Sequence, residues 1–251
     1  MKPILENWRK YLKEINVAVK GIKYERAVAA AMNSFFENNS LEYTASATGG
    51  AGKGSDVEVK DYSGNIVHTY EVKTSKGTRV DFGQFRVSYD SSTGWTQATG
   101  LDNDVVKAIF QEVESTLDSE VSPKIVPFPK GPQLTPDSAA MFWESYLERP
   151  REKSLSGDIT TIPVSKDLIQ RYYSEKGDNF IILGDDIYSL SDNILPSLSE
   201  ALRESYVVFR IKYHRKDILG IRKFSYTLAL RGKFIDTKET DFGTAMKKIY
   251  F

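Results

Sequence analysis

The chain has 251 residues, and its 34 basic and 34 acidic side chains give a formal net charge of zero. It contains no cysteine and only two histidines, which excludes disulfides, cysteine nucleophiles, thiolate metal sites and histidine-rich metal sites. Hydrophobic residues make up 40% of the chain, and no run of about 18 apolar residues occurs. The composition therefore predicts a globular protein without a membrane-spanning helix, whose chemistry depends mainly on carboxylates, lysines and hydroxyls.

Charge is unevenly distributed along the chain. Residues 101–200 carry 9 basic and 18 acidic side chains, whereas residues 201–251 carry 12 basic and 5 acidic ones. A locally basic segment can bind a polyanion even in a chain of zero net charge. Alternatively, the two segments compensate each other's charge in the fold.

The first 120 residues are predicted to form helices and a β-hairpin. The expected elements are helices over 5–15 and 18–38, strands over 56–60 and 66–73, short extended stretches over 79–98, and a helix over 102–117. In the second helix, hydrophobic residues recur at three- and four-residue spacing on one face, which contains Ile22, Ala29, Met32 and Phe36. The turn sequence over 62–65 joins the two strands.

Five prolines between residues 121 and 136 indicate a break in regular structure. The elements expected beyond it are a helix over 137–148, a strand over 159–164, a helix over 166–176, a hairpin of 180–183 and 187–190, and strands over 205–213 and 224–231. The sequence thus predicts an α/β core over 1–120, a proline-rich linker over 121–136 and an α+β extension over 137–251.

Glu25 is an unusual residue for its position. It lies between Ile22 and Ala29 on the apolar face of the second helix, where a carboxylate would be partly buried. A buried carboxylate needs a cation or a metal as partner, or it takes up a proton. The alternative is that the face is slightly rotated and Glu25 lies at its edge.

Asp56, Glu71 and Lys73 form a second group. Glu71 and Lys73 are two residues apart on one strand, so their side chains leave the same face. The short hairpin turn places Asp56, on the neighbouring strand, near Glu71. Two carboxylates form the oxygen-rich environment that Mg²⁺ prefers, and a lysine beside them can orient or deprotonate a water molecule. The alternative is a solvated strand face with a weak ion pair.

A helix bearing Gly21-x-x-x-Glu25, a glycine-rich loop, Asp56 and then Glu71-Val72-Lys73 follow one another in order. This series resembles the PD-(D/E)xK nuclease superfamily, and most closely its archaeal Holliday-junction resolvase branch. The resemblance covers residues 18–90 and implies a restriction-endonuclease-like core of a helix and a mixed sheet. It implies that Asp56 and Glu71 bind Mg²⁺, for which Mn²⁺ substitutes, that Glu25 joins this metal shell, and that Lys73 is catalytic.

Two further site predictions concern Gln84 and Lys53. Several branches of the superfamily carry a glutamine on the element after Glu-x-Lys, and Gln84 is the matching residue, although the sequence around it favours extended structure over the expected helix. Ser55 stands where the family often has proline. Lys53 belongs to the glycine-rich loop 49–54, whose backbone N–H groups would suit a DNA phosphate; the alternative is a plain connector.

The segment 210–233 contains eight lysines or arginines and one acidic residue. Alternation over 206–213 is expected to place its basic residues on one strand face, suited to the phosphates of DNA. The alternative is a solvated sheet face. The residues predicted to contact DNA are Arg210, Lys212, Arg215, Lys216, Arg222 and Lys223.

The sequence therefore predicts a Mg²⁺-dependent DNA endonuclease, and the resemblance further implies a homodimer. The first residues, Pro3–Leu12, are similar to the N-termini of many bacteriophage proteins, and the acid and amide at Glu6 and Asn7 do not fit a secretory signal. Both features favour a phage-encoded enzyme in the host cytoplasm. Two alternatives remain: a non-catalytic DNA-binding or virion assembly protein on the same fold, and a sequence-specific restriction or homing-type endonuclease.

Overall fold

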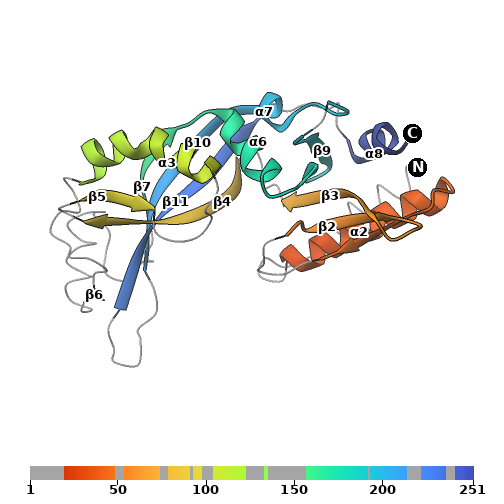
Figure 1. Ribbon diagram of the computed structural model, residues 1–251, viewed down its shortest axis with the longest axis horizontal. Helices are drawn as coiled ribbons and strands as arrows, with labels where there is room; N and C mark the ends of the chain where they lie inside the picture. The colour runs from red at the N-terminus through yellow and green to blue at the C-terminus, as the bar shows by residue number, and fades with distance from the viewer. Residues whose placement is uncertain are drawn as a thin grey trace. The chain divides into compact units, whose positions relative to one another are not determined.

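The computed structural model describes residues 20–48, 54–73, 79–90, 93–97, 104–122, 133–134, 157–191, 193–213, 222–235 and 241–251. The fold is mixed α/β, with helices and two separate β-sheets (Figure 1). The chain divides into two compact units, each assembled from segments far apart in the sequence. Unit 1 contains residues 1–80, 169–203 and 233–251, and unit 2 contains residues 81–168 and 204–232.

Unit 1 is built around a five-stranded sheet in the order β1-β2-β3-β8-β9. Its strands are β1 (Tyr43–Ala47), β2 (Val57–Asp61), β3 (Ile66–Lys73), β8 (Phe180–Leu183) and β9 (Asp186–Ser189). Its helices are α2 (Lys20–Asn38), α7 (Leu198–Ala201), α8 (Phe242–Tyr250) and α6 (Lys166–Ser174), the first three residues of which belong to unit 2. The first three strands form an antiparallel meander, β8 runs parallel to β3, and β9 returns antiparallel to β8.

The predicted hairpin of β2 and β3 is confirmed. In its turn, both the Ser63 and the Asn65 backbone N–H groups donate to Asp61 Oδ1, each at 2.9 Å. Gly64 adopts a positive φ of 83°, a conformation that glycine reaches without strain. These local contacts set the register in which Val57 lies opposite Tyr70. The hairpin is therefore specified by its own sequence.

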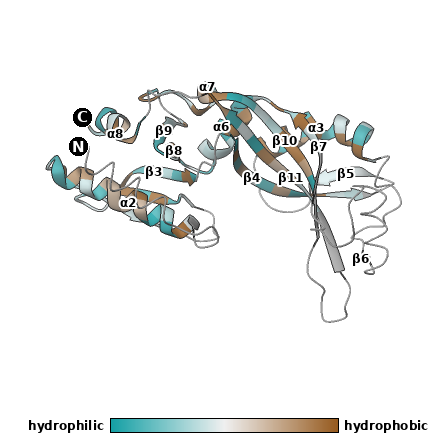
Figure 2. Ribbon diagram, turned by 180° about the vertical axis from the view of Figure 1, so that it is seen from behind, coloured by the Kyte–Doolittle hydropathy of each residue, from teal (hydrophilic) through white to brown (hydrophobic). Residues whose placement is uncertain are grey.

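Helix α2 is amphipathic, with hydrophobic and hydrophilic residues on different faces (Figure 2). Its buried face contains Tyr24, Val28, Ala29, Met32, Phe35 and Phe36. Ile22, which we predicted to lie on this face, is 49% exposed, because the face is rotated toward Tyr24 and Val28. The rotation leaves Glu25 half-buried at the edge of the apolar face.

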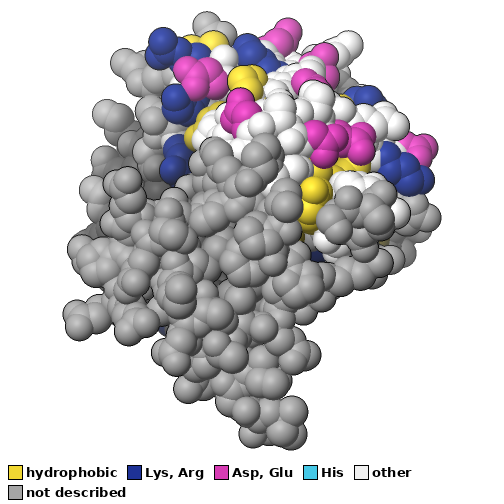
Figure 3. Space-filling view, turned by 90° about the vertical axis from the view of Figure 1, so that its left-hand side faces the viewer, with side chains coloured by type: hydrophobic (Ala, Val, Ile, Leu, Met, Phe, Trp, Pro, Cys, Tyr) yellow, Lys and Arg dark blue, Asp and Glu magenta, His cyan; other side chains and the backbone are white. Residues whose placement is uncertain are grey.

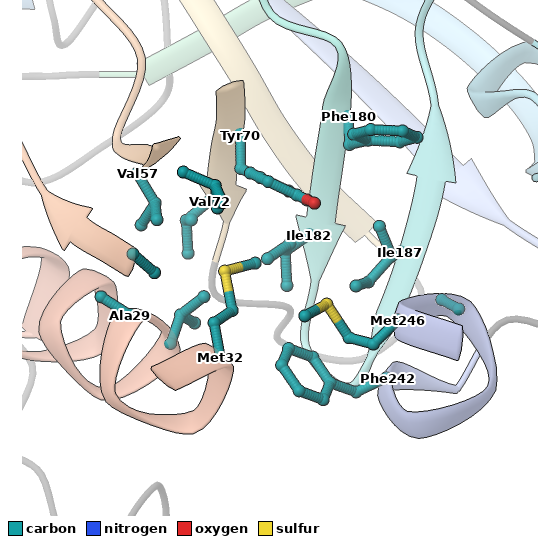
Figure 4. Packing of buried hydrophobic residues seen from close by; sticks show 14 of the residues in the cluster. Ala29, Met32, Val57, Tyr70, Val72, Phe180, Ile182, Ile187, Phe242 and Met246 are labelled. Atoms are coloured by element: carbon teal, nitrogen blue, oxygen red, sulfur yellow. The ribbon is translucent and has the colours of Figure 1, made fainter. Parts of the chain in front are cut away.

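The core of unit 1 fills the space between one face of the sheet and the helices α2 and α8 (Figure 4). Met32 from α2 and Met246 from α8 meet the strand residues Val72 and Ile182 there. The Tyr70 and Tyr250 hydroxyls are 2.9 Å apart, a hydrogen bond that links α8 to β3. Because side chains alternate along a strand, burying Tyr70 and Val72 on this face directs Glu71 to the opposite one.

Unit 2 is built around a second sheet in the order β5-β4-β11-β10-β7, with β6 paired to β11. Its strands are β4 (Arg79–Asp90), β5 (Gly94–Gln97), β6 (Gln133–Leu134), β7 (Gly157–Pro163), β10 (Leu202–Tyr213) and β11 (Arg222–Phe234). Helix α3 (Asp104–Thr116) runs directly into a π-helical turn, η1 (Leu117–Val121). The predicted helix over 102–117 is thus found, and it buries Val105, Val106, Ile109 and Val113 and leaves Phe110 half-buried.

The two units do not coincide with the boundaries 1–120, 121–136 and 137–251 that we predicted. The hairpin of β8 and β9 was found at the expected place, but β8 completes the sheet of unit 1 by pairing with β3. Pairing between distant strands leaves no local trace in the sequence. The expected helices over 5–15 and 137–148 and most of the proline-rich segment lie outside the described residues. Among the described helices, none is long and apolar enough to cross a membrane.

Candidate functional site

The site predicted from the sequence lies in unit 1, at the end of strand β3. Glu71 and Lys73 leave the same face of β3, as expected, and Lys73 Nζ forms an ion pair with Glu71 Oε1. Glu71 is only 3% exposed, so this is a buried carboxylate and the solvated-face alternative is wrong for it. Val72, between them, belongs to the core on the other face.

Asp56 lies beside Glu71, as the hairpin predicts. Its backbone N–H donates to the Tyr70 carbonyl, and its carboxylate oxygen Oδ2 accepts a hydrogen bond of 2.9 Å from the Val72 N–H. Asp56 lies immediately before Val57, the first residue of β2. Its side chain therefore reaches across to the backbone of β3. The local hairpin therefore fixes two carboxylates at neighbouring positions.

Helix α2 brings Glu25 toward the same end of the sheet. The neighbouring Tyr24 hydroxyl donates to the Gly184 carbonyl at 2.7 Å, and the Gly184 N–H donates to the Lys73 carbonyl at 3.2 Å. This chain of contacts ties the first turn of α2 to the end of β3. Glu25 Oε2 is buried without a hydrogen-bond partner.

The structure adds a second lysine that the sequence analysis missed. Lys176 follows helix α6, and its Nζ lies 2.8 Å from Glu71 Oε2. Both oxygens of Glu71 are thus paired with an ammonium group, one from Lys73 and one from Lys176. Beneath both lysines lies the buried ring of Tyr173, whose centroid is 5.7 Å from Lys73 Nζ and 5.0 Å from Lys176 Nζ. An ammonium group is attracted to an aromatic face at such distances.

The turn that carries Lys176 is firmly attached to strand β3. The Thr69 N–H donates to Asn179 Oδ1 at 3.0 Å, and the Asn179 N–H donates to the Thr69 carbonyl at 3.1 Å. The Thr69 hydroxyl donates to the Gly177 carbonyl at 2.8 Å. Gly177 itself has a φ of 92°, which favours glycine at this position. These contacts hold Lys176 next to Glu71 although the two residues are 105 positions apart.

Asp178, in the same turn, is a further carboxylate missed from the sequence. It is 1% exposed, and neither of its oxygens has a hydrogen-bond partner of good geometry. Its Oδ2 lies 4.0 Å from Lys176 Nζ, at the limit of an ion pair. A carboxylate so deeply buried and so weakly paired is costly to keep charged.

The carboxylates raise one another's pKa values. Burial, followed by the charges of Asp56 and Glu71, raises the pKa of Glu25. Burial and the Glu71 charge raise the pKa of Asp56, against the Val72 N–H that lowers it. Burial raises the pKa of Asp178 to about 6, although the Ser55 side chain opposes the rise. Acidic groups with mutually raised pKa values in one place are typical of functional sites.

The donor set of this cluster suits Mg²⁺, because carboxylate oxygens are the ligands that hard divalent cations prefer. Glu25 Oε2, beside them, is buried without a hydrogen-bond partner, which a cation would supply. In the described part of the chain, however, no three acidic or histidine side chains converge closely enough to hold a metal ion together. The residue types therefore suit a divalent cation, but in this structure both oxygens of Glu71 are paired with lysine ammonium groups.

Gln84 does not lie in this unit. It is an exposed residue of β4, in unit 2, whereas Glu25, Asp56, Glu71 and Lys73 all belong to unit 1. The extended structure suggested by the sequence around Gln84 is confirmed. The helix that continues unit 1 after Glu-x-Lys is instead α6, which follows the segment 81–168 of unit 2.

Only some of the residues predicted to contact DNA can be placed. Arg210 and Lys212 lie on β10, and Arg222 and Lys223 lie on the neighbouring strand β11, while Lys53, Arg215 and Lys216 lie outside the described residues. Arg231, which the sequence analysis included in the same basic segment, is 2% exposed and pairs with Asp81, so it is unsuited to DNA contact. On the face shown in Figure 3, acidic and basic side chains are interspersed over the coloured part.

One signal in the sequence pointed to the missed residues. Lys176 and Asp178 lie four and two residues before Phe180–Leu183, a run of four buried residues of the kind found in central parallel strands. Such a strand can bring the polar residues just before it close to residues that are distant in the sequence. The local sequence does not show, however, that its pairing partner is β3.

Comparison of the chain with protein-family models, with curated proteins and with solved structures gave no match.

Proposed function

We propose that this chain is a Mg²⁺-dependent DNA endonuclease whose unit 1 is a restriction-endonuclease-like core. The order of elements supports the proposal: α2 bears Glu25, the meander β1-β2-β3 carries Asp56 and Glu71-Val72-Lys73, and α6 continues the unit. This is the order of the PD-(D/E)xK pattern that the sequence resembles. The 88 residues of the segment 81–168 are an insertion between Lys73 and the continuation of the core.

The observation that carries the proposal is the placement of Asp56 against β3. Its carboxylate is held by the Val72 N–H, one residue from Glu71 and one from Lys73. Two acids and one lysine are thereby fixed by backbone contacts of a single hairpin. A weak surface ion pair would not require a carboxylate that is 3% exposed.

The chemical roles follow from these positions. A divalent cation supplies Lewis acidity that offsets the charge of the attacked phosphate. Asp56 and Glu71 would hold the cation. Glu25, which has a buried oxygen without a hydrogen-bond partner, would add a third negative charge beside them. Lys73 would orient or deprotonate the attacking water, since it is half-exposed and lies next to Glu71. Basic residues of β10 and β11, among them Lys212 and Arg222, would contact DNA phosphates.

The proposal is tested by cleavage of a labelled panel of linear duplex, supercoiled plasmid, single strand, fork and four-way junction. Each substrate is incubated with Mg²⁺, Mn²⁺ or EDTA, with the wild-type chain, Lys73→Ala and the control Lys60→Ala. Lys60 is a matched control because it is a lysine of the same hairpin paired to a glutamate, Glu58, but 42% exposed. We expect cleavage that needs the metal, is abolished by Lys73→Ala and is retained by Lys60→Ala.

Each result distinguishes the proposal from its alternatives. A single preferred cut in mixed DNA would identify a restriction or homing-type enzyme, and preference for the junction would identify a resolvase. Absence of cleavage on every substrate, without metal binding, would contradict the enzyme. DNA binding that persists under those conditions would identify a DNA-binding or virion assembly protein on a nuclease-like fold.

A further inference from the structure

The turn after α6 places a lysine against Glu71, one of the two carboxylates that would hold the metal. Lys176 Nζ lies 2.8 Å from Glu71 Oε2, while Lys73 takes Oε1. A divalent cation on Glu71 would lie close to two ammonium groups, and repulsion between like charges favours the departure of one of them. We therefore expect one of the two lysines to move when Glu71 acts as a ligand.

Lys176 is the lysine that has a second acceptor nearby. Asp178 Oδ2 is already within 4.0 Å of its Nζ, only a small side-chain movement from a close ion pair. Asp178 is 1% exposed and neither of its oxygens has a hydrogen-bond partner of good geometry, so it gains from receiving an ammonium group. A buried charge left without a partner would be strongly unfavourable for either residue.

The backbone of the turn is suited to such an exchange because it does not need to move. Asn179 and Gly177 are hydrogen-bonded to Thr69 of β3, and the Asp178 N–H donates to the Tyr173 carbonyl. The ring of Tyr173 lies under Lys176 and stays in contact with its ammonium group. Only side-chain torsions of Lys176 would change.

We propose that Lys176 is a positioning residue that holds Glu71 in the metal-free protein and transfers to Asp178 when a divalent cation takes its place on Glu71. This inference rests on the proposed function, because it requires that Glu71 bind a metal. It assigns Asp178 the role of a lysine acceptor and not that of a metal ligand.

The decisive experiment is a double-mutant cycle in which Mn²⁺ binding to the full chain is measured by titration calorimetry. The variants are Lys176→Gln, Asp178→Asn and their combination. Glu175→Gln and Lys247→Gln serve as controls, since they remove one exposed charge of each sign in the same unit. Circular dichroism and thermal melting verify that each variant is folded.

We expect Lys176→Gln to bind Mn²⁺ more tightly, because no ammonium competes for Glu71. Asp178→Asn should weaken binding by about fivefold, within the range of coupling between neighbouring charges. In the Lys176→Gln background, Asp178→Asn should have almost no effect, because Asp178 acts through Lys176. The charge-conserving variant Lys176→Arg should bind Mn²⁺ more weakly than Lys176→Gln.

A second measurement, on the wild-type chain, avoids any variant that fails to fold. Lysine side chains labelled with ¹³C at Cε are followed by NMR during a Mg²⁺ titration, with Lys176→Arg used only for assignment. The Lys176 signal should shift with the same midpoint as metal binding, and the Lys60 signal should stay in place.

The outcomes separate the inference from the proposed function. If the wild-type chain binds metal and cleaves DNA, but Asp178→Asn weakens Mn²⁺ binding equally in both backgrounds, Asp178 is a ligand or a simple charge and the inference alone is overturned. An unmoved Lys176 signal at metal saturation overturns it as well. If neither the wild-type chain nor Lys176→Gln binds any metal, the proposed function fails together with it.

Discussion

The two units bury polar groups in opposite ways. In unit 2, the buried Trp95 Nε1 donates to Ser122 Oγ at 2.9 Å, and the buried Arg231 pairs with Asp81 at 2.5 Å. In unit 1, Asp178 is buried with neither oxygen hydrogen-bonded, and Glu25 has a buried oxygen without a partner. Every unpartnered buried side-chain atom of the described residues belongs to unit 1.

This difference indicates where the protein gives up stability. A satisfied buried pair costs little once it is formed, whereas like charges in a buried cluster oppose folding. Folds keep such conflicts mainly where a ligand or a reaction needs them. The contrast therefore places the unsatisfied buried carboxylates in unit 1, whereas the buried polar groups of unit 2 named above are paired. Three predictions test or refine this comparison.

The largest expected effect is that of Asp56→Asn. The variant should lose metal-dependent cleavage by at least about 100-fold, as expected when a residue that holds or orients a catalytic metal is changed. Because burial and the Glu71 charge raise the pKa of Asp56, the neutral side chain should leave the unfolding free energy at pH 7 unchanged or higher. Cleavage rates and urea denaturation measure the two quantities. A variant that is destabilised but active would assign Asp56 a structural role.

The next effect concerns the pH dependence of stability in the metal-free protein. The pKa of Asp178 rises from 3.8 to about 6 on folding, so the folded state binds more protons between these values. The contribution of Asp178 to the unfolding free energy should thus be largest below pH 3.8. It should fall as the pH rises from 3.8 through 6. Asp178→Asn removes this loss, and we expect it to gain about 2–3 kcal/mol at pH 7 and almost nothing at pH 4.

Urea denaturation in EDTA at the two pH values measures this difference. Glu175→Gln is the matched control, since Glu175 lies three residues away in the sequence and is exposed. An equal gain at pH 4 and pH 7 would show that packing of the amide, and not the charge, is responsible.

The smallest expected effect is on unit 2. Asp81→Asn leaves the guanidinium of Arg231, which is 2% exposed, with a weaker acceptor. Since Asp81 itself is 62% exposed, we expect a loss of only about 1–2 kcal/mol in unfolding free energy. Thermal and urea denaturation of the variant measure it, with Asp104→Asn as the control. A gain in stability would reverse the contrast between the two units.

The parts of the site that could be predicted are those that depend on short segments. The alternation of β3 places Glu71 beside Lys73, and the turn at Gly64 places Asp56 against Val72. Both relations arise within one hairpin, where register follows from the turn. Glu25 shows the limit of periodicity, because a small rotation of α2 exposed Ile22 and moved Glu25 to the edge of the buried face.

The sequence by itself determined the mixed α/β class, the hairpin that joins two acids to a lysine, and the absence of cysteine chemistry. Only the tertiary structure decided which distant residues complete the cluster. Lys176 reaches Glu71 across 105 positions because β8 pairs in parallel with β3, and Thr69 holds the connecting turn through Asn179. Pairing between distant strands is set by the packing of the whole unit around Tyr70 and Phe180, and the local pattern of residues carries no record of it.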